Sequence, residues 1–175
     1  MIRIIPITST EEIHSLIKIL KESQITDIWL WNMLIEPDEF IEKPLDFYLS
    51  NRTFTDYYLC LKGESIIGYA RLGLTYSWKK RMRHRYSLWP FYITPKFRWY
   101  GYGVIFLDLI ISAIIEHSAE RYISIILQVN TENVWAIKTY ERCNFHIIGK
   151  EISHLKLWEN FTDCYIMQRI IEKSK

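Results

Sequence analysis

The stretch ITPKFRWYGYGVIFLDLI, residues 93–110, decides the architecture of this chain. It starts at the end of a strand-like segment (85–94), and two glycines, Gly101 and Gly103, stand just before a long apolar run. Glycine is unfavourable inside a helix or strand, so a pair here indicates that the backbone needs freedom or a close approach. Unpaired N–H groups and the dipole at a helix start bind anions. The stretch therefore predicts a strand, an anion-binding loop with Arg98 beside it, and a helix, with a purely structural turn as the alternative.

The segments on either side alternate between strand and helix patterns. The expected elements are a strand at 3–8, a helix opened by a Ser9–Glu12 capping box, a short helix near 45–49, a hairpin at 56–76 turning at Lys62–Gly63–Glu64, strands at 85–94 and 121–129, a helix at 133–142, and strands near 145–152 and 164–170. The unit at 85–129 requires a right-handed crossover between parallel strands. We therefore predict an α/β fold, a mixed and mostly antiparallel sheet with helices on both faces.

Composition limits the class of protein. The chain has 175 residues, 49% hydrophobic and 24% charged, and no linker-like tract, which indicates a single domain over 1–175. The net charge of +2 gives no general attraction to nucleic acid. Three cysteines without metal-ligand spacing favour a reduced compartment, and no metal site is predicted. The N-terminus lacks a signal-peptide pattern, and the longest apolar run (104–115) is shorter than the roughly 20 residues of a membrane span. We expect a soluble, cytoplasmic protein.

Two common phosphate-binding motifs do not fit the glycine loop. A Walker loop needs Gly-Lys-Ser/Thr at the helix start, where this chain has Gly103, Val104 and Ile105. A dinucleotide fingerprint needs a third small residue where Phe106 stands.

Two further blocks follow the first in order, LQVNTENVWAIKTYERCNF (127–145) and DCYIMQRI (163–170). Together the three resemble the GNAT superfamily of acetyl-CoA-dependent N-acetyltransferases. Its pattern is a strand ending in Pro, then Arg/Gln-x-x-Gly-x-Gly/Ala and a helix, then Asn-x-x-Ala-x-x-x-Tyr-x-x-x-Gly-Phe. Four residues of the second block fall in register with that pattern: Asn133, Ala136, Tyr140 and Phe145. The resemblance covers about 60–170.

The resemblance implies a domain in which two parallel strands splay apart and acetyl-CoA binds as co-substrate. The acceptor would be a primary amine, on a small molecule or a protein, attacking the thioester directly. Tyr140 would be catalytic, donating a hydrogen bond to the departing thiolate. The residues implied to bind the cofactor are Phe91, Tyr92, Ile93, Arg98, Trp99, Tyr100, Gly101, Tyr102, Gly103 and Asn133. Asn133 could also be no more than a helix cap.

The sequence departs from the family pattern at three places. Asn144 stands where the family has glycine, a benign change because Asn tolerates the left-handed conformation. Trp99 and Tyr100 replace small and basic residues in the loop. The strand at 85–94 holds no carboxylate, so the general base stays open among His84, Tyr92 and ordered water. Cys143 has no local His or carboxylate and is not expected to be a nucleophile.

The acceptor side is described less well by the sequence. Trp29, Trp31 and His84 are candidate substrate contacts. Two rival functions stay open: a non-catalytic module of the same fold that senses CoA, and a nucleic-acid binder using the basic run KKRMRHR (79–85), where strand spacing would align alternate arginines. A solvated rim is the plainer interpretation of that run. The oligomeric state is not set by the sequence, and a homodimer stays open.

Overall fold

The computed structural model describes residues 1–7, 9, 11, 12, 14, 15, 18, 55–75, 80–157 and 160–174. In these residues, seven strands form one sheet in the order β1-β2-β3-β4-β5-β7-β6. The strands are β1 (Ile2–Pro6), β2 (Thr55–Lys62), β3 (Ser65–Leu74), β4 (Arg85–Ile93), β5 (Tyr122–Asn130), β6 (His146–Leu157) and β7 (Asn160–Glu172). The helices are α5 (Tyr102–His117) and α6 (Val134–Arg142), with short 3-10 turns η2 (Lys80–Met82) and η3 (Pro95–Phe97).

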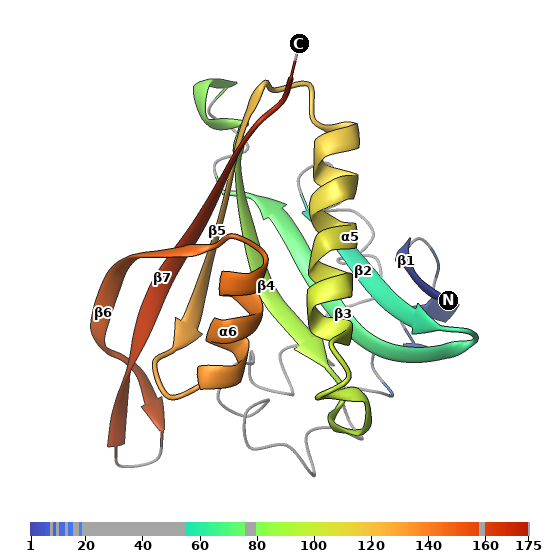
Figure 1. Ribbon diagram of the computed structural model, residues 1–175, viewed down its shortest axis with the longest axis horizontal. Coiled ribbons are helices and arrows are strands. Elements are labelled where there is room, and N and C mark those ends of the chain that lie inside the picture. The colour runs from blue at the N-terminus through green and yellow to red at the C-terminus, as the bar shows by residue number, and fades with distance from the viewer. Residues whose placement is uncertain are drawn as a thin grey trace.

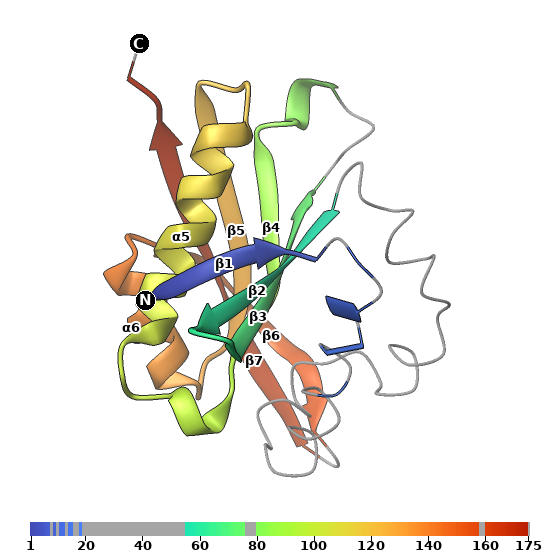
Figure 2. The same ribbon diagram turned by 90° about the vertical axis from the view of Figure 1, so that its right-hand side faces the viewer.

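The predicted α/β class and its mixed, mostly antiparallel sheet are confirmed. β4 and β5 pair in parallel across the α5 crossover, and every other described pair is antiparallel. Both α5 and α6 cover the same face of the sheet (Figures 1 and 2). The Ser9–Glu12 capping box is present, with each backbone N–H donating to the other side chain. The helix predicted near 45–49 lies outside the described residues.

The core lies between α5 and the sheet. The apolar run of α5 buries one face, made of Phe106, Leu107, Ile110, Ile111 and Ile114. It packs on alternate residues of β5, namely Ile123, Ile125, Leu127 and Val129. Side chains alternate between the faces of a strand, so Ser124, Gln128 and Asn130 belong to the opposite face. No helix of the described chain is long and apolar enough to span a membrane.

β4 and β5 stay together for only part of their length. Residues Arg85–Ser87 of β4 pair with Ser124–Ile126 of β5, and the pairing ends there. Along β3, Leu88 pairs with Leu72 but Phe91 pairs with Ala70, so β4 holds one extra residue at Trp89–Pro90. Such a bulge bends a strand, and proline is tolerated there because it has no N–H to pair. Beyond the bulge the two parallel strands separate, as the resemblance implied.

Strand β4 begins at Arg85, as predicted, but two other expectations were wrong. Strand spacing does not apply to the basic run (79–85), because Lys80–Met82 forms a 3-10 turn. β6 and β7 extend to 12 and 13 residues, well past the predicted ranges, because each finds a partner along most of its length. The hairpin turn is as predicted, with Gly63 in the left-handed region at φ 61°.

Candidate functional site

A cavity of about 420 Å³ opens where β4 ends. It lies between the last residues of β4, the loop that follows, the start of α5, and α6. Its walls are Phe91, Tyr92, Ile93, Phe97, Arg98, Trp99, Gly101, Tyr102, Gly103, Val104, Glu132, Asn133, Trp135, Ala136, Thr139, Tyr140 and Arg142. The structure thus brings together all the predicted cofactor-binding and catalytic residues except Tyr100.

The loop ends in a conformation that suits glycine. Gly101 is the N-cap of α5, with φ 76°, and a Cβ built on it would meet nothing within 4 Å. The N–H groups of Val104 and Ile105 donate to the Gly101 carbonyl at 3.1 and 3.3 Å. The N–H groups of Tyr102 and Gly103 open the helix and have no carbonyl one turn earlier to bond. The cavity therefore receives the positive end of α5, which favours an anion.

Gly103 serves a different purpose from Gly101. A Cβ on Gly103 would lie 3.3 Å from the Thr139 Cγ2 atom, so this glycine lets α6 approach α5 closely. The paired glycines of the sequence thus divide into one that shapes the loop and one that packs the two helices. The packing sets the distance between the loop and the α6 residues that line the cavity.

Arg98 braces the end of β4 against the loop. Its Nε donates to the Ile93 carbonyl at 2.9 Å, and its guanidinium carbon lies 5.3 Å from the centroid of the Tyr92 ring. The sequence predicted a charge at the mouth of the loop. The geometry adds a positioning contact, which ties the strand end to the helix start.

The backbone at the end of β4 presents two N–H groups to the cavity side. The Thr94 N–H donates to the Ile67 carbonyl of β3 at 2.9 Å. Backbone groups alternate in direction along a strand, so those of Phe91 and Ile93 point away from β3, toward the edge that β5 has left. The Arg98 contact with the Ile93 carbonyl on that edge agrees with this direction. Two amides on an edge without a partner strand can bind a carbonyl oxygen that gains negative charge.

Tyr140 lies deep in the cavity wall. Its ring is 3% exposed and packs at 6.0 Å, centroid to centroid, from the rings of Phe91 and Phe145. Burial raises the pKa of the Tyr140 phenol above its ordinary value, since an ionised oxygen would be poorly solvated there. The hydroxyl therefore stays protonated and can act as a hydrogen-bond donor.

Three other residues named by the sequence now have structural descriptions. Asn133 caps α6, because its Oδ1 accepts the Ala136 N–H at 3.1 Å, and it also lines the cavity. Asn144 takes the left-handed conformation at φ 58°, as expected. Cys143 is buried with a pKa raised by burial to about 12, so it is not primed as a nucleophile.

The remaining candidates lie elsewhere. Tyr100 is 69% exposed and stacks on Tyr102 outside the cavity lining, with centroids 5.8 Å apart. His84 precedes β4, where its carbonyl accepts the Ser124 N–H. Phe91 lies seven strand positions after His84, a span of about 23 Å. The structure does not bring His84 to the cavity. Trp29 and Trp31 lie outside the described residues.

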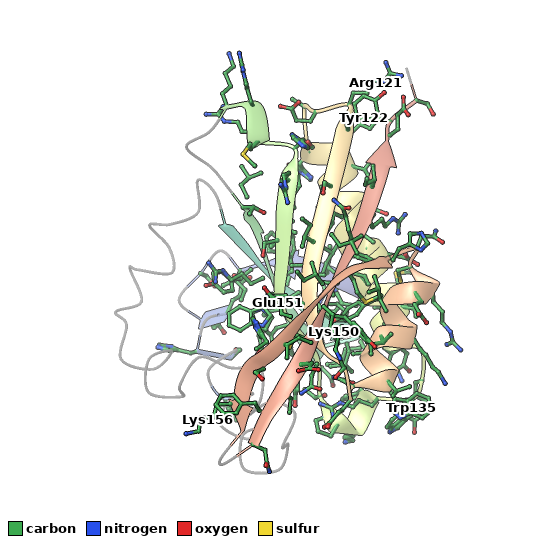
Figure 3. All side chains as sticks on the ribbon, turned by 90° about the vertical axis from the view of Figure 1, so that its left-hand side faces the viewer. Arg121, Tyr122, Trp135, Lys150, Glu151 and Lys156 are labelled. Carbon is green, nitrogen blue, oxygen red and sulfur yellow. The ribbon has the colours of Figure 1, made fainter. Side chains whose placement is uncertain are left out.

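Sequence reasoning missed a polar network on the opposite face of the sheet. The Glu151 Oε2 atom accepts a hydrogen bond from Gln128 Nε2 at 2.5 Å and lies 2.8 Å from His154 Nδ1. Gln128 belongs to the face of β5 opposite α5, and Glu151, labelled in Figure 3, lies on β6. Glu151 and His154 are both partly exposed, so a ligand on that face could reach them.

A bulge in β6 brings His154 back onto Glu151. Glu151 pairs with Cys164 and Leu155 with Thr162, so three residues of β6 oppose Asp163 alone. Ser153 takes φ 55° there, and its N–H donates to Asp163 Oδ1 at 2.9 Å. Because a bulge depends on the register between the two strands, no residue type in β6 alone indicated this contact.

Comparison with known proteins identifies a family. A sequence model of the acetyltransferase (GNAT) family matches residues 15–145. None of the curated proteins compared with the chain matches its sequence.

Solved structures show the same fold. A GNAT-family acetyltransferase from Streptococcus pneumoniae is 21% identical, covers 98% of this chain and 99% of its own, and has a TM-score of 0.74. A ribosomal-protein-alanine N-acetyltransferase from Brucella melitensis is 19% identical, with the same coverage and TM-score. Spermidine N-acetyltransferase from Vibrio cholerae, solved with CoA and spermine, is 15% identical, covers 97% of this chain and 95% of its own, and has a TM-score of 0.75.

Proposed function

Because the chain belongs to the GNAT family of acetyltransferases, we propose that it transfers the acetyl group of acetyl-CoA to a primary amine that attacks the thioester directly. One observation carries the proposal. At the point where β4 leaves β5, a single cavity is bounded by the helix-start amides of α5, the free edge of β4 and the Tyr140 ring. These are the parts that binding a phosphorylated acyl carrier and stabilising its leaving group require.

The residues present fit a cofactor with a pyrophosphate and a long arm. The amides of Tyr102 and Gly103, with the dipole of α5, would hold the pyrophosphate, and the left-handed Gly101 keeps side chains away from it. The arm would follow the edge of β4 toward Phe91, past Asn133 of α6. Acetyl-CoA, when bound, supplies the acetyl thioester.

Two groups would act on the thioester. The N–H groups of Phe91 and Ile93 would donate to its oxygen as negative charge develops there. The Tyr140 hydroxyl would donate to the sulfur as the bond to carbon breaks. The raised pKa of Tyr140 makes complete proton release unfavourable, so this contact is a hydrogen bond and the proton on the departing thiol comes from the amine.

We propose that the Glu151 carboxylate takes one proton from the ammonium form of the amine before attack. The second proton, which the amine loses as it bonds to the acyl carbon, goes to the departing thiolate. Glu151 lies on the sheet face opposite α5, at the level of Asn130, where the gap between β4 and β5 would give an amine access to the thioester. Gln128 and His154 hold the carboxylate from two sides, which fixes its orientation. His84 is too far along β4 for this role. A phenol such as that of Tyr92 is ordinarily protonated near neutral pH, where a carboxylate is ionised and can accept a proton.

The acceptor is an amine of either of two kinds. Among the proteins of similar fold, one is described as a spermidine and one as a ribosomal-protein-alanine acetyltransferase. We propose the broader class, a primary amine on a small molecule or a protein, without choosing between them.

The test is thiol release from acetyl-CoA, measured against a panel of polyamines, arylalkylamines, amino acids and peptides with free N-termini. The proposal predicts release that depends on one class of amine and an acetylated product of matching mass. CoA binding with no turnover on any amine would instead favour the non-catalytic sensing module. If the chain neither binds CoA nor releases thiol from acetyl-CoA with any amine, the proposal is wrong.

A further inference from the structure

Trp99 occupies a backbone conformation that bulky side chains avoid. Its φ is 71°, in the left-handed region, where a residue other than glycine, asparagine or aspartate is unusual. Burial does not compensate for this, because Trp99 is 69% exposed. Gly101, two residues further along, has a similar φ of 76° and no side chain to clash. A tryptophan that strains the loop and gains little burial calls for another explanation.

The exposed ring of Trp99 has a partner from the other wall of the cavity. Trp135, in the first turn of α6, lies 4.3 Å away, centroid to centroid, and the two planes meet at 80°. Trp135 is itself 61% exposed, and Figure 3 shows it at the outer end of α6. Both rings line the cavity. They form an aromatic corner (Trp99 and Trp135) in which both residues are more than half exposed.

A positive charge stands beside this corner. The Lys138 Nζ lies 5.5 Å from the centroid of the Trp135 ring, one turn further along α6. Flat aromatic surface next to an ammonium group suits a ligand that joins a planar base to a phosphate.

We infer that the aromatic corner binds the adenine ring of coenzyme A, with Lys138 beside the 3′-phosphate. The inference rests on the proposed function. It gives a binding site to the adenosine end of the cofactor, which the α5 amides, the β4 edge and Tyr140 do not contact. With the pyrophosphate on the α5 amides and the arm running inward to Tyr140, the adenosine lies on the outer side of the loop. Trp99 and Trp135 line the cavity and are both largely exposed aromatic residues.

Stacking explains why the strain at Trp99 is retained. A base stacked on an aromatic side chain typically changes affinity by about 5- to 150-fold, and every base offers such a face. Glycine at position 99 would relieve the backbone strain there, and a smaller residue at position 135 would still leave the phosphate-binding amides in place. The corner therefore contributes affinity for the nucleotide end of the cofactor, and not for the acyl end.

The experiment compares two ligands that differ at that end. Calorimetry measures binding of CoA and of 4′-phosphopantetheine to the wild-type chain and to Trp99→Gly and Trp135→Ala. 4′-Phosphopantetheine lacks the adenosine, its 3′-phosphate and one phosphate of the pyrophosphate. Phe161→Ala, which removes a similarly exposed aromatic on β7, is the matched control. Each tryptophan variant should lose about 5- to 150-fold in CoA affinity and keep its affinity for 4′-phosphopantetheine. Trp99→Gly should leave the Tm of the free protein unchanged or raise it, because glycine accepts the positive φ.

Three results would overturn the inference, and they have different meanings. Unchanged CoA affinity in both variants would show that the rings serve another contact, such as a protein partner. An equal loss for both ligands, with a lowered Tm, would show that the rings only hold the loop in place. A wild-type chain that binds neither ligand would remove the proposed function itself, and the inference with it.

Discussion

The two ends of β4 make an instructive comparison. At its start, the turn Lys80–His84 carries most of the positive charge of the region, and the strand is paired on both sides, with β3 and with β5. At its end, the loop before α5 carries fewer charges, but β5 has separated and a cavity has opened. If positive charge alone marked the binding site of an anionic ligand, the first end of β4 would be favoured. Unsatisfied backbone groups facing a cavity favour the second, and substitutions at the two ends can distinguish these criteria.

The largest effect is expected from Gly101→Val. Valine resists the left-handed φ, so the loop must shift and the amides of Tyr102 and Gly103 lose their alignment. Loss of two or more charge-assisted hydrogen bonds, each about 1.5–3 kcal/mol, should weaken CoA binding by at least about 10²-fold. Calorimetric titration with CoA measures this.

Gly63→Val is the matched control for that variant. Gly63 has a similar φ of 61° and equally open surroundings, but it lies in the β2–β3 turn. Both variants should lose similar thermal stability, and only Gly101→Val should lose CoA affinity. Equal CoA affinity in the two would mean that the loop before α5 is only a turn.

Tyr140→Phe should lower kcat by about 10²-fold with little change in KM for acetyl-CoA. The ring stays in its packing, and the hydroxyl is needed only as sulfur leaves, so the loss falls on the transition state. Steady-state kinetics with the identified amine gives both constants. A variant with wild-type kcat at neutral pH would make Tyr140 a packing residue.

The raised pKa of Tyr140 also gives the same variant a pH signature. The protonated form is favoured in the folded chain, so its contribution to stability is complete below about pH 10 and is lost as the pH rises toward the folded-state pKa. Raising the pH above 10 should therefore lower the free energy of unfolding of the wild-type protein more than that of Tyr140→Phe, as measured by urea unfolding. An identical pH dependence in both would contradict the burial argument.

Glu151→Gln should lower kcat/KM by about tenfold near neutral pH, because the amine loses its nearest proton acceptor while water can replace part of the function. Activity should recover as the pH rises and more of the amine is unprotonated. Glu172→Gln, which removes a carboxylate paired with Arg121 at the other end of the sheet, should keep its kcat/KM. A pH–rate profile for Glu151→Gln parallel to that of the wild type would remove the assignment.

The smallest effects separate the arginines at the two ends of β4. Arg98→Ala should weaken CoA binding by about 3- to 10-fold, since it loses the brace on the Ile93 carbonyl and one positive charge. Arg83→Ala, in the basic turn, should change neither CoA affinity nor the Tm. A larger effect at Arg83, or steeply salt-dependent nucleic-acid binding that Arg83→Ala reduces, would reverse the comparison.

The sequence predicted those parts of the fold that local chemistry determines. The α5 start, the α6 cap at Asn133 and the left-handed Asn144 follow from residue types at fixed spacings. Pro90 inside a strand was a usable sign of the β4 bulge, because proline cannot donate to a ladder. That sign was not interpreted, so the separation of β4 from β5 came only from the family resemblance.

Features set by strand register or by an unusual residue in a turn could not be predicted. The contact of His154 with Glu151 depends on how many residues of β6 oppose Asp163, which no local pattern encodes. The positive φ of Trp99 was equally hidden, because the usual sign of that conformation is glycine and the chain has tryptophan there. The two departures from local expectation, Trp99 and the β6 bulge, are also the places where we locate binding and catalysis.

Thermal unfolding of the wild-type chain with and without CoA tests the central claim, that the loop between β4 and α5 binds this cofactor, most directly. At 100 times its Kd, a ligand bound only by the folded state adds about 2.7 kcal/mol of stability. For a domain of this size, that predicts a rise in Tm of roughly 5–10 °C, which Gly101→Val should abolish and Gly63→Val should keep. A Tm that does not change in millimolar CoA would contradict the account.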